Sequence, residues 1–279
     1  MSYIDLHVHS NASDGTLSPS QVVNLASQSG LSAIALTDHD TTAGITEALE
    51  AGNKLGVEVI PGIEVSSNFQ GHEIHILGLF VDQDSPALQE ALREFRLRRD
   101  RRNQEMLSRF EAAGIHMTET ELQAGNPHTV ITRAHVARIL EEKGYGTSRS
   151  QIFKKYLEYG GPFCPPKEYL PPSDVLAALL ASGAFVALAH PFLYKLGDQK
   201  TFELISMLAG LGMKGLEVYH SSNNQLESAK LQEMAAKQNL LPTGGSDFHG
   251  SNKPDISIGT GRGGLRVSHL LLNDIKAAR

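Results

Sequence analysis

The stretch Ile4-Asp5-Leu6-His7-Val8-His9 joins a short apolar strand to two histidines at its end. Side chains two positions apart on a strand point to the same face, so His7 and His9 can reach one metal ion. Three further apolar segments of strand length follow, at residues 33–37, 57–61 and 74–80. The histidine pair therefore ends the first of several predicted strands.

Helices are predicted between these strands. Ser18-Pro19 is typical of a helix start, with proline at the first helical position, and this helix is expected to end at Gly30. A second helix is predicted over residues 44–55, with Thr41 or Thr42 as its N-cap. The alternation of strands and helices predicts an α/β fold with a parallel sheet or barrel covered by helices.

The alternation stops at Pro86 and returns after Pro172. Between them the pattern predicts a long arginine-rich helix and three shorter ones, over 88–113, from 118, and over 131–143 and 150–159. A helix and three strands then resume the alternation, at 173–182, 185–188, 215–218 and 240–243. We therefore expect a catalytic barrel made of residues 1–85 and 173–279, and a mostly helical insertion of residues 86–172 that covers the active site.

Composition limits the class of protein. The chain has 279 residues, 41 % of them hydrophobic, and a net charge of −6, which is ordinary for a globular protein and gives no support for general nucleic-acid binding. No apolar run reaches the roughly 20 residues that span a bilayer, and the first residues lack the pattern of a signal peptide. A single cysteine, Cys164, excludes an internal disulfide. We expect a cytoplasmic protein with no membrane partner and no obligate protein partner.

Histidines and acidic residues recur where the predicted strands end, and these ends converge on one face of an α/β barrel. The set comprises His7, His9, Asp38-His39-Asp40, Glu64, His190, Asp247 and His249, and His75 lies within the strand predicted over residues 74–80. One such histidine alone is more often structural than a ligand, but several independent strand ends favour a metal cluster. Mixed imidazole and carboxylate ligands suit zinc, manganese or iron, and about four ligands per ion would allow two or three ions.

Seven motifs, in this order, resemble those of the polymerase and histidinol phosphatase (PHP) superfamily. They are His7-Val8-His9-Ser10, Ser13-Asp14-Gly15, Thr37-Asp38-His39-Asp40, Pro61-Gly62-Ile63-Glu64, His72-Glu73-Ile74-His75, Ala189-His190-Pro191 and Gly245-Ser246-Asp247-Phe248-His249. Within the PHP superfamily, the chain is similar to the bacterial 3′,5′-nucleoside bisphosphate phosphatases, which are also described as the 5′→3′ exoribonuclease RNase AM. Their insertion resembles the segments 132–138 and 153–157.

The resemblance implies a distorted (β/α)7 barrel with three metal ions, commonly Mn²⁺, with Zn²⁺, Fe²⁺ or Mg²⁺ as alternatives. It assigns His7, His9, Glu64 and Asp247 to the first ion. Glu64 would bridge to a second ion that His75 and His190 also hold, and the third would be held by Asp14, His39 and His249. The chain departs from close relatives after His190-Pro191, where Phe192-Leu193-Tyr194 replaces a Gly-Arg-Tyr sequence.

These features predict a metal-dependent phosphoesterase. It would remove the 3′-phosphate of nucleoside 3′,5′-bisphosphates (pAp to AMP and phosphate), or remove nucleotides 5′→3′ from 5′-phosphorylated RNA. A metal-bound hydroxide would attack phosphorus. His220 is a candidate acid for the leaving oxygen, with structural packing as the equal alternative. Asp38 and Asp40 are candidates for accepting an imidazole N–H from a ligand.

A second phosphate on the substrate needs a second anion site, for which Arg133 is the first candidate and His135, Arg149 and Lys167 are weaker ones. Bracing of its own helix is the alternative role for Arg133. The arginine run over residues 93–109 is mixed with acidic residues, which favours a solvated helix face over a track for RNA.

Two other functions compete with this prediction. The first is a histidinol-phosphate phosphatase or another small-molecule phosphomonoesterase, which the helical insertion and Arg133 disfavour. The second is a PHP module kept for binding alone, which the complete set of ligand-type residues disfavours.

Overall fold

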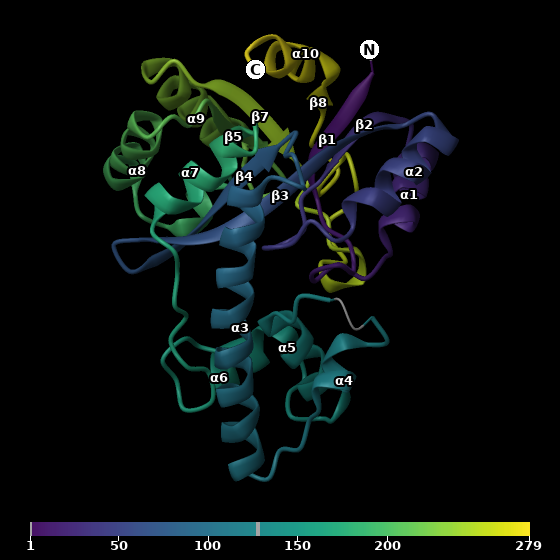
Figure 1. Ribbon diagram of the computed structural model, residues 1–279, viewed down its shortest axis with the longest axis vertical. Coiled ribbons are helices and arrows are strands. Elements are labelled where there is room, and N and C mark those ends of the chain that lie inside the picture. Colours follow the sequence, from purple (N-terminus) through teal and green to yellow (C-terminus); the bar gives the residue numbers. More distant parts are fainter. Residues whose placement is uncertain (1, 127–128) are drawn as a thin grey trace.

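The computed structural model describes residues 2–126 and 129–279, and they form a barrel with a helical insertion beneath it (Figure 1). The strands of the barrel are β1 (Tyr3–Val8), β2 (Leu31–Leu36), β3 (Glu58–Phe69), β4 (His72–Leu79), β5 (Phe185–Leu188), β6 (Gly215–His220), β7 (Leu241–Gly245) and the two-residue β8 (Val267–Ser268). They follow the order β7-β6-β5-β4-β3-β2-β1-β8 in one sheet.

Strands β1 and β7 meet across the remaining gap of the sheet. The N–H of Asp247 donates to the carbonyl of His7 at 2.8 Å, and the N–H of His9 donates to the carbonyl of Phe248 at 2.9 Å. Gly245 makes this approach feasible, because a Cβ there would lie 2.3 Å from the Cβ of His7. Seven strands thus nearly close a barrel, and β8 is an antiparallel addition to β1.

The barrel is distorted because β4 runs antiparallel to both of its neighbours, β3 and β5, whereas the other barrel pairs are parallel. The predicted distorted (β/α)7 barrel is confirmed. The prediction that Glu64 follows a strand is wrong, because β3 continues past residue 61 to Phe69 and places Glu64 in its middle. Pairing of residues 62–69 with β4 keeps this part of the chain extended.

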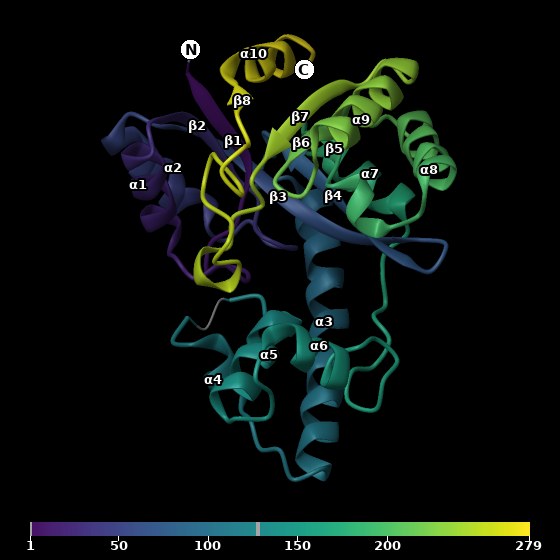
Figure 2. The same cartoon turned by 180° about the vertical axis from the view of Figure 1, so that it is seen from behind.

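Helices cover the outside of the barrel, with α1 and α2 on one side and α7, α8 and α9 on the other (Figure 2). Their bounds are α1 (Pro19–Gln28), α2 (Ile45–Leu55), α7 (Pro172–Ala181), α8 (Asp198–Gly210), α9 (Gln225–Lys237) and α10 (His269–Ala277). Ser18 caps α1 in a reciprocal capping box with Gln21. The predicted threonine cap of α2 is wrong: Gly44 is its N-cap, and the Thr41 hydroxyl accepts the N–H of Ala43.

The insertion is built on one long helix, α3 (Pro86–Ala112), with α4 (Glu119–Gln123), α5 (Arg133–Glu142) and α6 (Arg149–Tyr156) around its lower half (Figure 1). Leu88, Leu92 and Phe95 at the start of α3 belong to a core cluster of the barrel. Met106 and Phe110 near its end belong to a separate core of the insertion. A single rigid helix therefore ties the two cores together. No helix among the residues described is long and apolar enough to cross a membrane.

Candidate metal centre

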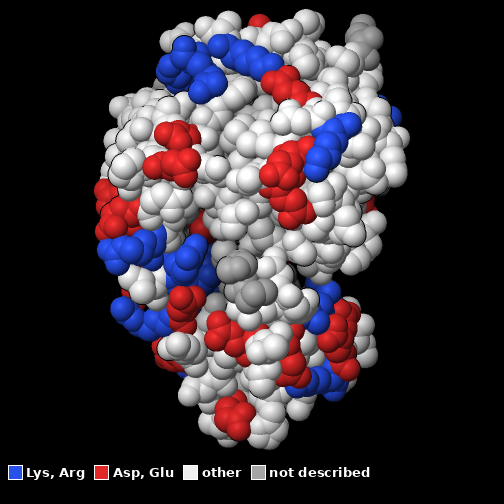
Figure 3. Space-filling view, turned by 45° about the vertical axis from the view of Figure 1, so that its right-hand side comes forward, with Lys and Arg blue, Asp and Glu red and all other residues white. Residues whose placement is uncertain are grey.

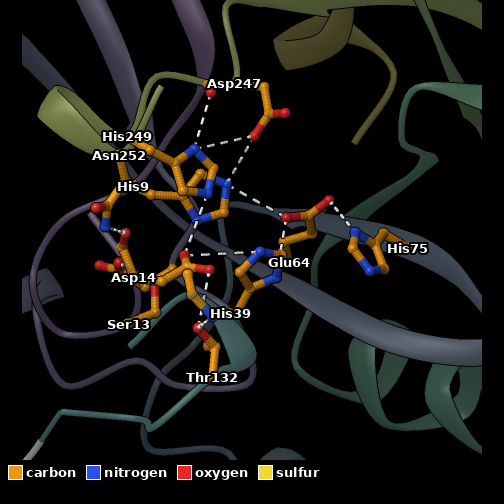
Figure 4. Close-up of polar contacts among 12 residues, drawn as sticks. His9, Ser13, Asp14, His39, Glu64, His75, Thr132, Asp247, His249 and Asn252 are labelled. Carbon is orange, nitrogen blue, oxygen red and sulfur yellow. Dashed lines mark hydrogen bonds and ion pairs between the residues drawn. The ribbon is translucent and has the colours of Figure 1, made fainter. Parts of the chain in front are cut away.

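The nine predicted ligands gather where β1, β2, β5 and β7 end, around the middle of β3 and the start of β4. Figure 4 labels all of them except His7 and His190. Three groups among them have ligand atoms within 4.8 Å of one another: His7, His9, Glu64 and Asp247; His39, Glu64 and His75; and His9, Asp14, His39 and His249. His190 completes the set, with its Nε2 2.9 Å from Oε1 of Glu64.

Glu64 lies at the centre of the cluster. Its Oε2 faces Nε2 of His7 and Nε2 of His9, each at 3.3 Å, and Nδ1 of His39 at 3.1 Å. Its Oε1 is 2.9 Å from Nδ1 of His75. Burial would raise the pKa of this carboxyl, but the charges of His7, His75 and His39 hold the pKa well below its usual range. Because imidazole nitrogens surround both of its oxygens, this carboxylate could be shared by two cations if they were bound.

Asp14 joins the cluster from the loop that follows β1. Its Oδ1 lies 3.1 Å from Nε2 of His249, and its Oδ2 accepts a hydrogen bond from the Thr132 hydroxyl at 3.3 Å. Gly15 is required at the next position, because a Cβ there would lie 2.5 Å from the carbonyl oxygen of His9. The loop therefore packs directly on the end of β1 and brings a carboxylate to His39 and His249.

The cluster contains buried polar atoms that have no hydrogen-bond partner in the part of the chain described. Among them are Nε2 of His7, Nε2 of His9, Oδ1 of Asp14, Nδ1 of His39 and Oε2 of Glu64. Buried polar atoms are normally satisfied, because leaving one without a partner costs about 1–3 kcal/mol. Imidazole nitrogens and carboxylate oxygens facing one another at these distances fit divalent cations between them.

Glu217, on β6, is a residue of the site that the sequence patterns did not predict. Its Oε1 accepts a hydrogen bond from Nδ1 of His7 at 2.9 Å, and its Oε2 accepts the N–H of His190 at 2.7 Å. Burial alone would lower the pKa of His7, but the charges of Glu217 and Glu64 raise this pKa well above its usual value. Glu217 thus fixes the ring of His7 with Nε2 toward the cluster.

Asp38 and Asp40 do not accept a hydrogen bond from a histidine in the residues described, so the prediction for them is wrong. Asp38 accepts hydrogen bonds from the hydroxyls of Ser10 and Ser13, each at 2.6 Å. Asp40 accepts the N–H of Ser66 at 2.9 Å and pairs with Arg99. Both carboxylates stabilise loops that carry ligands instead of orienting imidazole rings.

His220 lies beside the cluster. The N–H of Ser222 donates to its Nδ1 at 3.1 Å, so a neutral ring carries its proton on Nε2. That Nε2 is buried, has no hydrogen-bond partner among the residues described, and lies 3.6 Å from Oδ2 of Asp247. The ring therefore presents a proton donor toward the ligands.

A pocket of about 140 Å³ opens beside His39, His75 and Asp14. Two of the predicted anion-binding residues, Arg133 and Lys167, line it. The Arg133 guanidinium stacks 3.6 Å from the centre of the Tyr159 ring and donates to the carbonyl of Leu157 at 3.1 Å. These contacts join Arg133 to the segment that follows α6, not to its own helix α5, and its side chain also lines the pocket.

The other two anion-binding candidates lie outside the lining of this pocket. His135 accepts the N–H of Thr132 at 3.0 Å in the capping box of α5. Arg149 donates to Glu141 at 2.9 Å and to Asn252 at 3.0 Å. These contacts give both residues structural partners in the insertion and at its border with the barrel.

Two arginines of α3, Arg99 and Arg102, line the same pocket, although the sequence pattern favoured a solvated face over an RNA track for this run. Arg99 is 9 % exposed and pairs with the buried Asp40. Elsewhere the helix does carry exposed ion pairs, such as Arg93 with Glu90 at 2.6 Å. Lys, Arg, Asp and Glu side chains are interspersed over the insertion (Figure 3), so the surface seen there shows no continuous basic track.

Lys167 is a cation of the pocket whose pKa is strongly shifted. Burial, together with the nearby charges of Arg99 and Arg102, lowers its pKa to about 7, although the carboxylate of Glu73 acts in the opposite direction. Glu73 pairs with Lys167 and also lies 3.6 Å from Nε2 of His75. It links the cation pocket to the cluster.

The PHP domain family matches residues 5–159, more than half of the chain. The chain belongs to the PHP family. This member is 34 % identical over 261 residues to a 3′,5′-nucleoside bisphosphate phosphatase of Chromobacterium violaceum, covering 93 % of this chain and 91 % of the relative. It is 35 % identical over 250 residues to a phosphoribosyl 1,2-cyclic phosphate 1,2-diphosphodiesterase of Eggerthella lenta, covering 88 % and 94 %.

A third relative is the 5′-3′ exoribonuclease Rnm of Escherichia coli, 35 % identical over 247 residues, with 88 % of this chain and 84 % of the relative covered. Among solved structures, a metal-dependent phosphoesterase of Bifidobacterium adolescentis superposes with a TM-score of 0.87 at 30 % identity, covering 99 % of this chain and 96 % of that one. The predicted enzyme class is confirmed: this PHP protein is a metal-dependent phosphoesterase.

Proposed function

We propose that this PHP phosphoesterase cleaves the 3′ ester of nucleotides that carry a 5′-phosphate. Its substrates would be nucleoside 3′,5′-bisphosphates, such as pAp, and the first linkage of 5′-phosphorylated RNA. The observation that carries the proposal is the pocket beside the cluster, with four cations in its lining: Arg99, Arg102, Arg133 and Lys167. The relatives from Chromobacterium violaceum and Escherichia coli, by their names, act on these two substrate classes.

The charge and size of this pocket suit a phosphate group. Its four cations outnumber its acids, Asp14 and Glu73. The volume of about 140 Å³ has room for a phosphate group. Guanidinium groups bind phosphate in a bidentate way, which favours an anchored 5′-phosphate over a loosely held one.

We assign the metal ligands as the sequence predicted them: His7, His9, Asp14, His39, Glu64, His75, His190, Asp247 and His249. Three groups of ligand atoms support three ions, and the mixed donors suit Mn²⁺, with Zn²⁺, Fe²⁺ or Mg²⁺ as alternatives. Bound ions would supply Lewis-acid activation of the phosphoryl group and of the attacking water. Metal analysis of the purified protein tests the identity of the ion.

The protein's own groups complete the proposed reaction. Arg133 and Lys167 bind the 5′-phosphate and so place the 3′ ester at the cluster. His220, with Nδ1 occupied by the Ser222 N–H, holds the proton on Nε2 that the leaving ribose oxygen receives. Glu217 keeps the ring of His7 in the orientation that binding requires.

A substrate panel tests the proposal. Metal-loaded protein would be assayed with adenosine 3′,5′-bisphosphate, with a short 5′-phosphorylated RNA, with a phosphoribosyl 1,2-cyclic phosphate and with an aryl phosphate. Arg133→Met and Lys167→Met would be compared with Arg149→Met, a matched control whose side chain lies outside the pocket.

We expect the two pocket variants to raise KM for the bisphosphate by roughly tenfold or more, since charge-assisted hydrogen bonds contribute about 1.5–3 kcal/mol. Turnover of the aryl phosphate, which has no second phosphate, should change little in the same variants. Equal losses on both substrates would refute the anchoring role, and preferred turnover of the cyclic phosphate would replace the proposed substrate class.

A further inference from the structure

A second opening lies next to the cation pocket at the metal cluster. This second opening has a volume of about 250 Å³ and shares only His39, Glu73 and His75 with the cation pocket. Its other lining residues are Glu64, His190, Leu193, Tyr194, Asp247 and Lys253. The cluster therefore borders two neighbouring openings, each with lining residues of its own.

The wall of the second opening is a short 3₁₀ helix, Pro191–Tyr194, that follows the ligand His190. Contacts with the barrel hold Phe192 and Tyr194 of this helix in place. The Tyr194 hydroxyl accepts the N–H of His75 at 2.8 Å and donates to the carbonyl of Ala189 at 2.7 Å, and Phe192 packs against the barrel core. Leu193, between them, is 44 % exposed. A rigid turn thus presents one large apolar side chain to solvent beside the metal ligands.

A phosphomonoester does not need this second opening, whereas a phosphodiester does. In pAp the scissile phosphorus carries one organic group, the 3′ oxygen of the nucleoside whose 5′-phosphate occupies the cation pocket. In RNA the same phosphorus carries a second group, the 5′ oxygen of the next nucleotide. That nucleotide has to leave the cluster away from the cation pocket, and the second opening provides the space.

We propose that the second opening binds the nucleotide on the 3′ side of the scissile phosphate, with its base against Leu193. This inference rests on the proposed function. Lys253, the one lysine or arginine in the described lining of this opening, pairs with Asp247 at 2.5 Å, so the feature that favours a nucleotide here is the exposed apolar side chain of Leu193 and not the charge of the lining. Bases pack against apolar as well as aromatic side chains, and such contacts tolerate any base. Leu193 is then a residue that sets the preference for RNA relative to nucleoside bisphosphates.

The same bond is broken in both substrates. Water adds its oxygen to phosphorus, the P–O3′ bond breaks, and the 3′ oxygen receives a proton. With pAp the products are AMP and inorganic phosphate. With RNA they are a 5′-mononucleotide and a strand shortened by one residue that carries a new 5′-phosphate, so the product can bind again as substrate.

The experiment compares two substrates, adenosine 3′,5′-bisphosphate and the 5′-phosphorylated dinucleotide pApA. The variants are Leu193→Asp, the conservative Leu193→Met, and the control Leu211→Ala. Leu211 is an equally exposed leucine, at 40 %, and lines neither opening. The readout is the ratio of kcat/KM for pApA to kcat/KM for the bisphosphate.

We expect Leu193→Asp to lower this ratio by roughly tenfold through KM, because the new carboxylate repels the strand and the base loses an apolar contact, which we place at the lower end of the about 1–3 kcal/mol that stacking on an aromatic ring contributes. Leu193→Met and Leu211→Ala should keep the ratio of the parent protein. Equal losses on both substrates would mean that Leu193 only positions His190, and would overturn the inference.

Assays of the parent protein distinguish failure of this inference from failure of the proposed function. Turnover of the bisphosphate without turnover of pApA would overturn the inference and leave the proposed phosphatase activity intact. Absence of turnover on both substrates in metal-loaded protein would refute the proposed function itself.

Discussion

Nδ1 of His7 lies 2.9 Å from Oε1 of Glu217, although the two residues are 210 positions apart in the chain. Both side chains are fully buried, and the other oxygen of Glu217 accepts the N–H of His190. One carboxylate therefore orients two of the proposed metal ligands, from a strand that contributes no ligand of its own to the three groups.

Replacing Glu217 should weaken metal binding without removing a ligand. We expect Glu217→Ala to lower metal affinity by roughly 10–100-fold, the usual effect of deleting a group that orients a ligating histidine. Glu217→Gln should lose less, because its amide oxygen still accepts the proton of His7. Calorimetric titration of stripped protein with Mn²⁺ measures this, with the exposed Glu233→Ala as control. Unchanged affinity in Glu217→Ala would contradict the role.

The ion pair between Arg99 and Asp40 should stabilise the junction of insertion and barrel. Its side chains are 9 % and 2 % exposed, so Arg99→Met leaves a buried carboxylate unpaired and should cost about 3–5 kcal/mol of unfolding free energy. Arg93→Met, in an exposed pair, should cost less than about 1 kcal/mol. Urea unfolding measures both values. In a double-mutant cycle, Arg99→Met with Asp40→Asn should cost clearly less than the sum, and simple additivity would argue against direct coupling.

Anion binding should weaken as the pH rises through neutrality. The pKa of Lys167 is about 7, lowered by burial and by Arg99 and Arg102 against the opposing charge of Glu73; the ring of Tyr169 also faces its ammonium. Below this pKa the lysine is charged and binds phosphate; above it the charge is lost, so KM for the bisphosphate should rise. Lys167→Arg should remove this rise, because arginine stays charged. An identical pH profile in both proteins would exclude Lys167 as its cause.

The closure of the barrel should depend on Gly245. An added methyl would meet His7 at 2.3 Å, so Gly245→Ala should destabilise the protein by about 1–3 kcal/mol or more and weaken metal binding as well. Gly210→Ala is the matched control: it lies at the end of α8 with nothing within 4 Å of the added methyl, and should be neutral or stabilise by up to about 1 kcal/mol. Thermal unfolding and metal titration measure both effects.

The sequence predicted the chemistry at strand ends better than the contacts between elements. His7, His9, His190 and Asp247 could be found because each follows a short apolar segment, and such segments are recognisable one at a time. The full length of β3 could not be predicted in this way, because pairing with β4 holds its second half extended. Such pairing depends on two strands together and is not visible in either segment alone. For this reason the sequence places Glu64 after a strand, whereas it lies in the middle of β3.

Residues whose partners come from elsewhere in the chain were missed. Glu217 is one acid within an apolar strand, and nothing local shows that His7 faces it. Arg99 and Arg102 share a helix with exposed arginines. The helical period predicts which face of the helix they lie on, but it does not predict which other part of the chain packs against that face. A signal did exist for Glu217, since a buried acid needs a partner that compensates its charge.

We propose that this PHP protein cleaves bisphosphate nucleotides through the metal cluster. The decisive measurement is a titration of metal-stripped protein with Mn²⁺ in which bound metal and release of phosphate from adenosine 3′,5′-bisphosphate are measured in the same samples. We predict no turnover in stripped protein, activity that rises with occupancy, and loss of both metal and activity in His9→Ala. Full activity without metal, or fully loaded protein that releases no phosphate, would contradict the account.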